Sequence, residues 1–208
     1  MKYVSYIPEK ITSDMKCIIM LHGVGSNEGD LFSLSDYFGK DVYVFSLRGP
    51  FVLRIGSYAW YPVDFSSGKA IYKSEDVESG YNEIASFISE IVEKYNIPPE
   101  KIYLMGFSQG AIMSYYTLWK SPETIGGIIA LSGRIIREIH FASLDSQKYK
   151  NKKIFVGHGM MDQVIPFLEI EGVKKYLSQL GSASQIHKYP IGHTISTDEL
   201  QDIKIFLK

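Results

Sequence analysis

Short runs of apolar residues, each bounded by turn residues, recur along the chain and predict β-strands. The runs are Cys17 to Leu21, Val42 to Leu47, Lys101 to Met105, Ile125 to Leu131, Lys153 to Val156 and Gln185 to Tyr189. Most of them are apolar throughout and do not alternate with polar residues. This pattern is typical of strands that are covered on both faces, as in parallel sheets.

Stretches with apolar residues three and four positions apart lie between these runs and predict amphipathic helices. The clearest begins at Ser74 and ends at Asn96, just before a pair of prolines. A second ends at Gly181, and a third begins at Ser196 with Glu199 three residues later, the spacing of a capping box. Strands and helices that alternate in this way predict an α/β fold, with a mostly parallel central sheet between helices.

No internal repeat, low-complexity tract or linker divides the chain, so residues 1–208 are predicted to form a single domain. One segment, Arg48 to Lys73, has no sustained period and is rich in large apolar side chains: Phe51, Leu53, Tyr58, Trp60, Tyr61 and Phe65. Long irregular loops in compact domains tend to be functional. The alternative is a flap that only covers the edge of the sheet.

A candidate nucleophile lies between a predicted strand and a predicted helix. The sequence Gly106-Phe107-Ser108-Gln109-Gly110 fits the pattern G-x-S-x-G, in which small flanking residues permit a tight turn that exposes the serine hydroxyl. Glycine and serine are common in this chain, so the pattern alone is weak. The strand before it and the helix after it make Ser108 the candidate nucleophile.

Two later loops supply candidate partners in the order that this arrangement requires, an acid and then a histidine. Asp162 follows the strand Lys153 to Val156, and His193 follows the strand Gln185 to Tyr189. We therefore predict a triad in which His193 is the base and Asp162 orients it.

The other candidate groups fit less well. His187 lies within a strand, and His140 lies in a charged stretch that is typical of a solvated surface. His158 is expected to hold the loop of Asp162 through backbone hydrogen bonds. Ser132 has no G-x-S context, so both it and His158 are interpreted as structural.

Acyl transfer also needs two backbone N–H groups directed at the developing oxyanion. One is predicted to come from Gln109, the residue after the nucleophile. The other is assigned to Val24 in the sequence Leu21-His22-Gly23-Val24-Gly25-Ser26-Asn27, which follows the first strong strand. His22 is expected to brace this loop and to take no part in proton transfer.

Four segments in order, LHGVGSN, GFSQG, GHGMMD with a trailing VIP, and IGHT, resemble the phospholipase/carboxylesterase family, which includes the acyl-protein thioesterases. The resemblance implies an α/β-hydrolase fold without a separate lid domain and a Ser-Asp-His triad at Ser108, Asp162 and His193. It also implies that the aromatic segment, through Trp60 and Tyr61, lines an acyl pocket. We expect Val164 and Ile165, in the trailing VIP, to line the same pocket.

The activity expected from this resemblance is hydrolysis of small-molecule carboxylic esters with small to medium acyl chains. Lysophospholipase or acyl-protein thioesterase activity on the same triad is the alternative. Neither a metal nor an organic cofactor is implied, because nucleophile, base and oxyanion site all come from the chain itself. The oligomeric state is left open.

Composition and charge limit the partners and the cellular location that the protein is expected to have. The chain has 22 Lys and Arg against 23 Asp and Glu, so no excess of positive charge favours nucleic acid or an anionic membrane. With a single cysteine no disulfide forms within the chain. Neither a signal sequence nor an apolar run of about 20 residues is found, which predicts a soluble, cytoplasmic protein without stable membrane anchoring.

Two other functions were considered. Gly23, Gly25 and Gly29 follow one strand and Arg48 follows the next, as in some dinucleotide-binding oxidoreductases. The glycine spacing is not G-x-G-x-x-G, however, and this interpretation leaves Ser108 and its partners unexplained. A noncatalytic binding protein on the same fold is a remote alternative, which the presence of all three triad residues disfavours.

Overall fold

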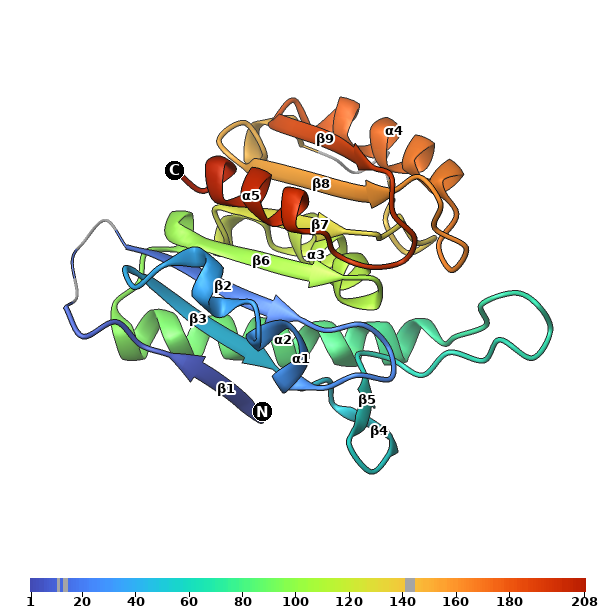
Figure 1. The fold of residues 1–208 in the computed structure, drawn as a ribbon, viewed down its shortest axis with the longest axis horizontal. Helices are drawn as coiled ribbons and strands as arrows, with labels where there is room; N and C mark the ends of the chain where they lie inside the picture. The colour runs from blue at the N-terminus through green and yellow to red at the C-terminus, as the bar shows by residue number, and fades with distance from the viewer. Residues whose placement is uncertain (11, 13–14, 141–144) are drawn as a thin grey trace.

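A computed structural model describes residues 1–10, 12, 15–140 and 145–208. Across these residues seven strands form one sheet in the order β1-β3-β2-β6-β7-β8-β9 (Figure 1). They are β1 (Tyr3–Tyr6), β2 (Lys16–Leu21), β3 (Val42–Leu47), β6 (Ile102–Phe107), β7 (Gly127–Leu131), β8 (Lys153–Gly159) and β9 (Ala183–Tyr189). In this sheet β1 runs antiparallel to β3, and the other neighbouring pairs are parallel.

The six strands predicted from the apolar runs are all present, and the α/β fold class is confirmed. Two of them continue beyond their predicted carboxyl ends, β6 to Phe107 and β8 to Gly159. The glycines that looked like turn residues in these two segments still pair with neighbouring strands. The functional loops consequently begin later than the sequence suggested.

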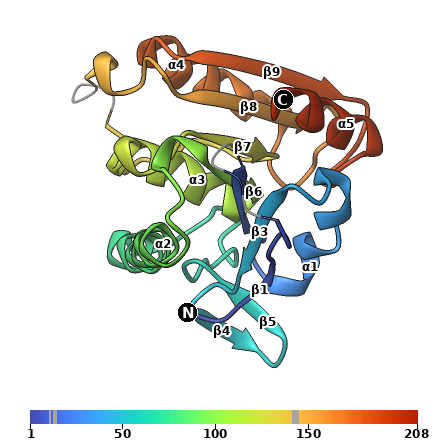
Figure 2. The same ribbon diagram turned by 90° about the vertical axis from the view of Figure 1, so that its left-hand side faces the viewer.

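Helices cover both faces of the sheet (Figure 2). One face carries α1 (Glu28–Phe32) and α5 (Thr197–Phe206), and the other carries α2 (Ser74–Tyr95), α3 (Gln109–Lys120) and α4 (Ile170–Leu180). Short 3₁₀ turns lie at Ser35–Phe38, Pro99–Lys101, Pro122–Thr124, Ser146–Lys148 and Phe167–Glu169. Within the described part of the chain, no helix is both long and apolar enough to cross a membrane.

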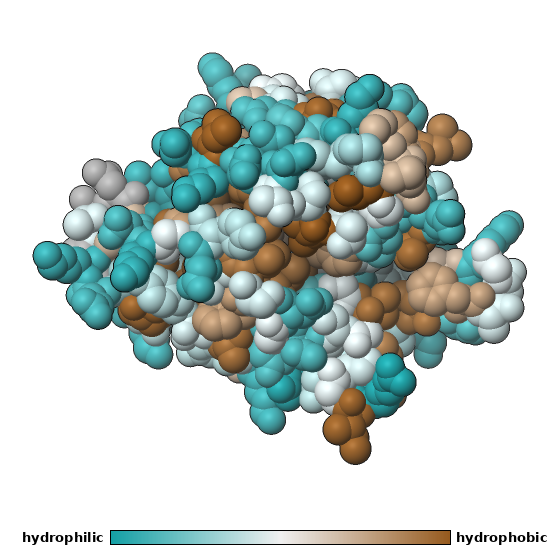
Figure 3. Space-filling model, viewed as in Figure 1, coloured by the Kyte–Doolittle hydropathy of each residue, from teal (hydrophilic) through white to brown (hydrophobic). Residues whose placement is uncertain are grey.

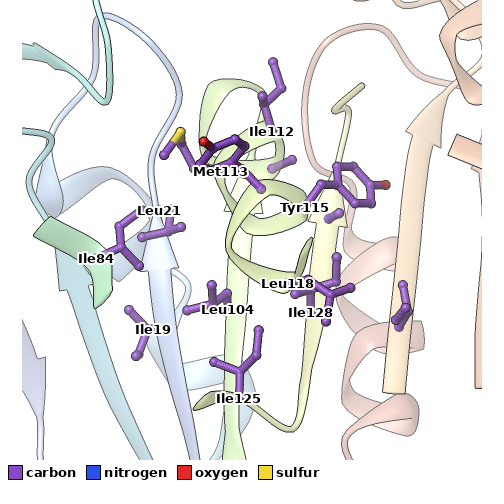
Figure 4. Close-up of a cluster of buried hydrophobic side chains, with 14 of the residues drawn as sticks. Ile19, Leu21, Ile84, Leu104, Ile112, Met113, Tyr115, Leu118, Ile125 and Ile128 are labelled. Carbon is purple, nitrogen blue, oxygen red and sulfur yellow. The ribbon is translucent and has the colours of Figure 1, made fainter. Parts of the chain in front are cut away.

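Successive residues of the buried strands contribute alternately to two hydrophobic cores, one on each face of the sheet. Ile19 and Leu21 of β2 point to the side of α2 and α3, where they join Ile84 and Leu104 (Figure 4). Ile18 of the same strand belongs to the second core, beneath α5. Because both faces are covered, the strand can be apolar at every position.

The helix ends follow the predicted signals. Ser196 caps α5 by accepting a hydrogen bond from the N–H of Glu199 at 3.1 Å, and Gly181 ends α4 in the left-handed region at φ 63°. Ser74 is the first residue of α2, as predicted. Its hydroxyl donates to Glu138 at 2.8 Å, so it is not available to cap the helix.

The aromatic segment contains a hairpin that the sequence did not reveal, β4 (Phe51–Arg54) and β5 (Ser57–Ala59). Its tip projects into solvent with apolar side chains exposed, visible as the brown group that protrudes at the bottom of Figure 3. Tyr58 of β5 exchanges two backbone hydrogen bonds of 2.8 Å with Gly25 and Ser26. The hairpin therefore supports the loop that follows β2.

Candidate active site

Ser108 stands on a sharp turn between β6 and α3. Its backbone is strained, with φ 55° and ψ −114°, a conformation that side-chain-bearing residues rarely adopt. The flanking glycines are required by space: a Cβ at Gly110 would lie 1.9 Å from the carbonyl oxygen of Leu21, and one at Gly106 would lie 2.2 Å from the carbonyl carbon of Gly110. The turn is therefore held tight enough to present the hydroxyl at the carboxyl edge of the sheet.

Ser108, His193 and Asp162 form a continuous line of hydrogen bonds. The Nε2 of His193 lies 2.9 Å from the Ser108 Oγ, and its Nδ1 lies 2.6 Å from Oδ2 of Asp162. Because an ionised carboxylate only accepts, Nδ1 carries the proton and Nε2 is left to accept one from the serine. This is the geometry in which a serine hydroxyl is activated as a nucleophile.

The Asp162 carboxylate is fixed by its own loop. Its Oδ1 accepts hydrogen bonds from the N–H groups of Val164 and Ile165, both at 2.9 Å. Burial alone would raise the pKa of Asp162, but the hydrogen bonds from His193 and from these two backbone groups hold it below its ordinary value. The carboxylate therefore stays ionised beside the imidazole.

His158 secures the same loop from beneath, as predicted. It is fully buried, and its Nε2 lies 2.9 Å from the carbonyl oxygen of Ile165. Since a carbonyl can only accept, Nε2 is the protonated nitrogen. His158 thus holds the loop of Asp162 through Ile165, and its Nε2 also lies 3.7 Å from Oδ2 of Asp162.

Val24 and Gln109, the residues predicted to supply the oxyanion donors, line the same cavity as Ser108. Gln109 is the first residue of α3, so its N–H has no acceptor within the helix. The N–H of Val24 is in the loop after β2, where Gly23 lies against Ser108: a Cβ on Gly23 would be 3.4 Å from the serine Cβ. The loop and the helix start therefore meet at the nucleophile.

His22 braces this loop, as the sequence analysis expected. Its Nδ1 lies 2.7 Å from the carbonyl oxygen of Gly23, and its Nε2 lies 3.0 Å from the backbone nitrogen of Gly49. Nδ1 must donate and Nε2 must accept, which defines a neutral imidazole. Burial lowers the pKa of His22, in agreement with this assignment.

Trp60 is placed differently from the prediction. It is fully buried and does not line the cavity beside Ser108. Its indole Nε1 donates to the carbonyl oxygen of His22 at 2.9 Å, and its backbone N–H donates to the side chain of Gln109 at 2.8 Å. The amide of Gln109 in turn donates to the carbonyl oxygen of Tyr61 at 2.7 Å. Trp60 therefore connects the two predicted oxyanion loops and is not a pocket wall.

A cavity of about 440 Å³ opens beside Ser108. Of the predicted pocket residues, Tyr61, Val164 and Ile165 line it. The sequence analysis missed several others: Val63, Phe65 and Tyr72 of the aromatic segment, Ile112 of α3, and the charged residues Lys69, Arg134 and Glu169. Only the aromatic content of the segment hinted at these residues, because the cavity joins loops that are distant in the sequence.

A smaller cavity of about 240 Å³ lies on the side of His193 and is lined by Phe107, Thr194 and Ile195 and by Asp30 and Leu31 of α1. The ring of Phe107 lies 4.8 Å from that of His193, centroid to centroid. The imidazole therefore faces a space that is separate from the larger cavity.

The remaining candidates lie elsewhere. His187 stacks on Phe155 at 4.7 Å, and His140 lies beside Trp119. Arg48, considered for a nucleotide phosphate, forms a two-pronged ion pair with Glu28 and is thereby occupied. Within the residues that the structure describes, no group of three or more metal-ligating side chains is arranged to hold a metal ion.

The sheet, its helices and the serine at the strand-to-helix turn define an α/β hydrolase. A sequence model of the phospholipase/carboxylesterase family matches residues 4–208, and the chain belongs to this family. It is accordingly a serine hydrolase of the carboxylesterase type.

Comparison with individual proteins agrees with this assignment. Acyl-protein thioesterase 1 of Kluyveromyces lactis is 31% identical over 206 residues, which cover 91% of this chain and 90% of the relative. The putative hydrolase MhqD of Bacillus subtilis is 25% identical, over 99% of this chain and 98% of its own. Among solved structures, esterase PE8 superposes with a TM-score of 0.86 at 27% identity, covering 100% of this chain and 98% of the esterase.

Proposed function

We propose that the protein hydrolyses carboxylic esters with small to medium acyl chains, through an acyl-enzyme formed on Ser108. The observation that carries this proposal is the unbroken line of hydrogen bonds from Asp162 through His193 to Ser108, beside a largely apolar cavity of about 440 Å³. A cavity of this size is within the usual range for small-molecule sites.

In the first half-reaction the Ser108 Oγ bonds to the carbonyl carbon while Nε2 of His193 takes the hydroxyl proton. The electron pair of the C=O bond moves to its oxygen, which accepts hydrogen bonds from the N–H groups of Val24 and Gln109. The tetrahedral intermediate then collapses, and His193 gives the proton to the leaving alcohol. Asp162 keeps Nδ1 protonated and stabilises the imidazolium in between.

In the second half-reaction water repeats the attack on the acyl-enzyme. His193 takes a proton from the water, and the resulting hydroxyl bonds to the acyl carbon. When the intermediate collapses, the proton passes to the Ser108 Oγ and the carboxylic acid leaves. The chain itself supplies every group that this scheme uses.

A thioester is the second candidate substrate, since the Kluyveromyces lactis relative is named an acyl-protein thioesterase and aligns over nearly its full length. The triad treats an oxygen and a sulfur leaving group by the same steps. Whether the ester or the thioester is hydrolysed faster depends on the residues that line the cavity and on those beside the leaving group.

The test is a series of p-nitrophenyl esters from C2 to C12, compared with a lysophospholipid and a palmitoyl thioester. We expect the highest kcat/KM among the short and medium esters, and stoichiometric labelling of Ser108 by a fluorophosphonate. The Ser108→Ala variant is the matched control and should be neither labelled nor active. Failure of the wild-type protein to react with the fluorophosphonate would overturn the proposal, and a maximum at the palmitoyl thioester would replace it with the second candidate.

A further inference from the structure

The larger cavity contains a cation for which the reaction scheme has no use. Arg134 lies in the segment after β7 and lines the cavity together with Ser108, Gln109 and Ile112. It is half-buried, and among the described residues its guanidinium has neither a hydrogen bond nor an ion pair. A guanidinium in this position retains its charge and its donors for a ligand.

The backbone directs Arg134 into the site. Gly133 packs against the first turn of α3, where a Cβ would lie 2.6 Å from the Cβ of Ala111. Ser132 has a positive φ of 49°, and its N–H donates to the carbonyl oxygen of Gly157 at 2.8 Å. The segment is thus turned back over the start of the helix that follows the nucleophile.

The charges around Arg134 leave the cavity positive. Glu138, its neighbour in the same segment, is occupied by Arg137 and by the hydroxyls of Tyr72 and Ser74. The charged side chains that line the cavity are Lys69 and Arg134 against Glu169. The wall of the cavity therefore carries one more cation than anion.

The position of His193 assigns this cavity to the acyl part of the substrate. His193 has to protonate the leaving alcohol, and it faces the smaller cavity, which also contains the carboxylate of Asp30. Val24 and Gln109, the proposed oxyanion donors, line the larger one. The alcohol therefore leaves on the side of His193, and the acyl chain extends toward Arg134.

We propose, on the basis of the proposed ester hydrolysis, that Arg134 selects acyl chains that end in a carboxylate, so that the preferred substrates are monoesters of dicarboxylic acids. Tyr61, Ile112 and Val164 contact the methylene chain, and the guanidinium binds the terminal carboxylate through paired N–H donors. Arg134 is a specificity-determining residue in this scheme and takes no part in bond breaking.

The experiment compares monomethyl esters of the C5 to C10 dicarboxylic acids with methyl esters of the monocarboxylic acids of equal length. Methanol release gives kcat/KM for each, and the measured quantity is the ratio of the anionic to the neutral ester. For the wild-type protein we expect this ratio to exceed one and to peak at one chain length. Arg134→Leu should lower the peak ratio at least tenfold, and Arg134→Lys should lower it less.

Arg54→Leu is the matched control, because Arg54 is exposed on the β4–β5 hairpin and its removal changes the net charge equally. It should retain the wild-type ratio. The inference is overturned if the wild-type ratio is one or less at every length, or if both leucine variants have the same ratio. If the wild-type protein releases methanol from neither the neutral nor the anionic esters, the proposed hydrolysis itself fails. Hydrolysis of neutral esters without an anionic preference overturns the role of Arg134 alone.

Discussion

At the scale of single residues, the two oxygens of Asp162 have separate tasks. Oδ1 accepts from two backbone N–H groups, and Oδ2 accepts from Nδ1 of His193. In Asp162→Asn the amide oxygen is expected to stay with the backbone donors, which places the NH₂ group against the imidazole. His193 would then carry its proton on Nε2 and could not accept one from Ser108. We expect kcat for ester hydrolysis to fall by about ten-thousandfold with the protein still folded; wild-type turnover would reassign the acid.

Ser108→Ala tests the nucleophile at the same scale. The substitution removes one hydroxyl and does not change Gly106 and Gly110, which permit the tight backbone turn. The thermal midpoint should therefore stay near that of the wild type. Turnover of p-nitrophenyl acetate should fall by roughly a millionfold, as is typical when one member of a cooperating triad is removed. Residual activity above about a hundredth of the wild type would mean that another nucleophile acts.

The residues that carry the proposed reaction were predictable because each directly follows a recognisable strand. Parallel strands end at one edge of a sheet, so Ser108, Asp162 and His193 had to lie near one another once the strands were recognised. Trp60 was placed wrongly, because its aromatic character suits a buried brace as well as a pocket wall. Arg134 was missed because it belongs to no motif, and only the turn at Ser132 and Gly133 brings it to the cavity.

At the scale of elements, the aromatic segment lines much of the larger cavity and also braces the two predicted oxyanion loops. Tyr58 pairs with the loop after β2, Trp60 binds the carbonyl of His22, and Gln109 ties the start of α3 to Trp60 and Tyr61. This role could not be predicted from local pattern, because all of these bonds join residues distant in the sequence. Strands β1, β4 and β5 escaped prediction for another reason, because each has only three or four residues.

Trp60→Phe tests this role with a smaller aromatic ring in place of the indole. It removes the indole hydrogen bond to His22 and keeps an aromatic ring in the core. We expect kcat/KM for p-nitrophenyl esters to fall by one common factor, about tenfold, at every chain length, since the loss of one buried hydrogen bond is worth roughly 1 kcal/mol or slightly more. Chain-length profiles measured well below the melting temperature give the answer. A loss that grows with chain length would show that Trp60 contributes to binding of the acyl chain.

At the scale of the whole molecule, the candidate site depends on how α5 packs against β8, the strand that leads to the loop of Asp162. Glu199 of α5 is only 1% exposed, and its Oε2 has no hydrogen-bond partner in the described part of the chain. Gly157 of β8 leaves room for it: a Cβ there would lie 1.9 Å from Oε1 of Glu199. Burial raises the pKa of Glu199 to about 7, against an opposing hydrogen bond from the backbone of Ser196.

This raised pKa makes the stability of the fold depend on pH. The unfolded chain releases the proton of Glu199 near its ordinary pKa of 4.5, whereas the folded chain keeps it until about 7. Stability from this group is therefore fully present below pH 4.5 and is lost as pH rises toward and through 7. Between pH 5.5 and 8.5 the loss amounts to about 2 kcal/mol.

Glu199→Gln removes the titration and keeps the shape of the side chain. We expect the variant to gain about 2 kcal/mol relative to the wild type when the pH is raised from 5.5 to 8.5, because only the wild type must then either take up a proton on folding or hold an ionised carboxylate in the interior. Urea unfolding of both proteins at the two pH values measures the difference. The substitution lies in neither the triad nor the oxyanion loops, so ester hydrolysis at pH 5.5 serves as the control for native structure. An equal difference in unfolding free energy at both pH values would show that Glu199 does not titrate in this range.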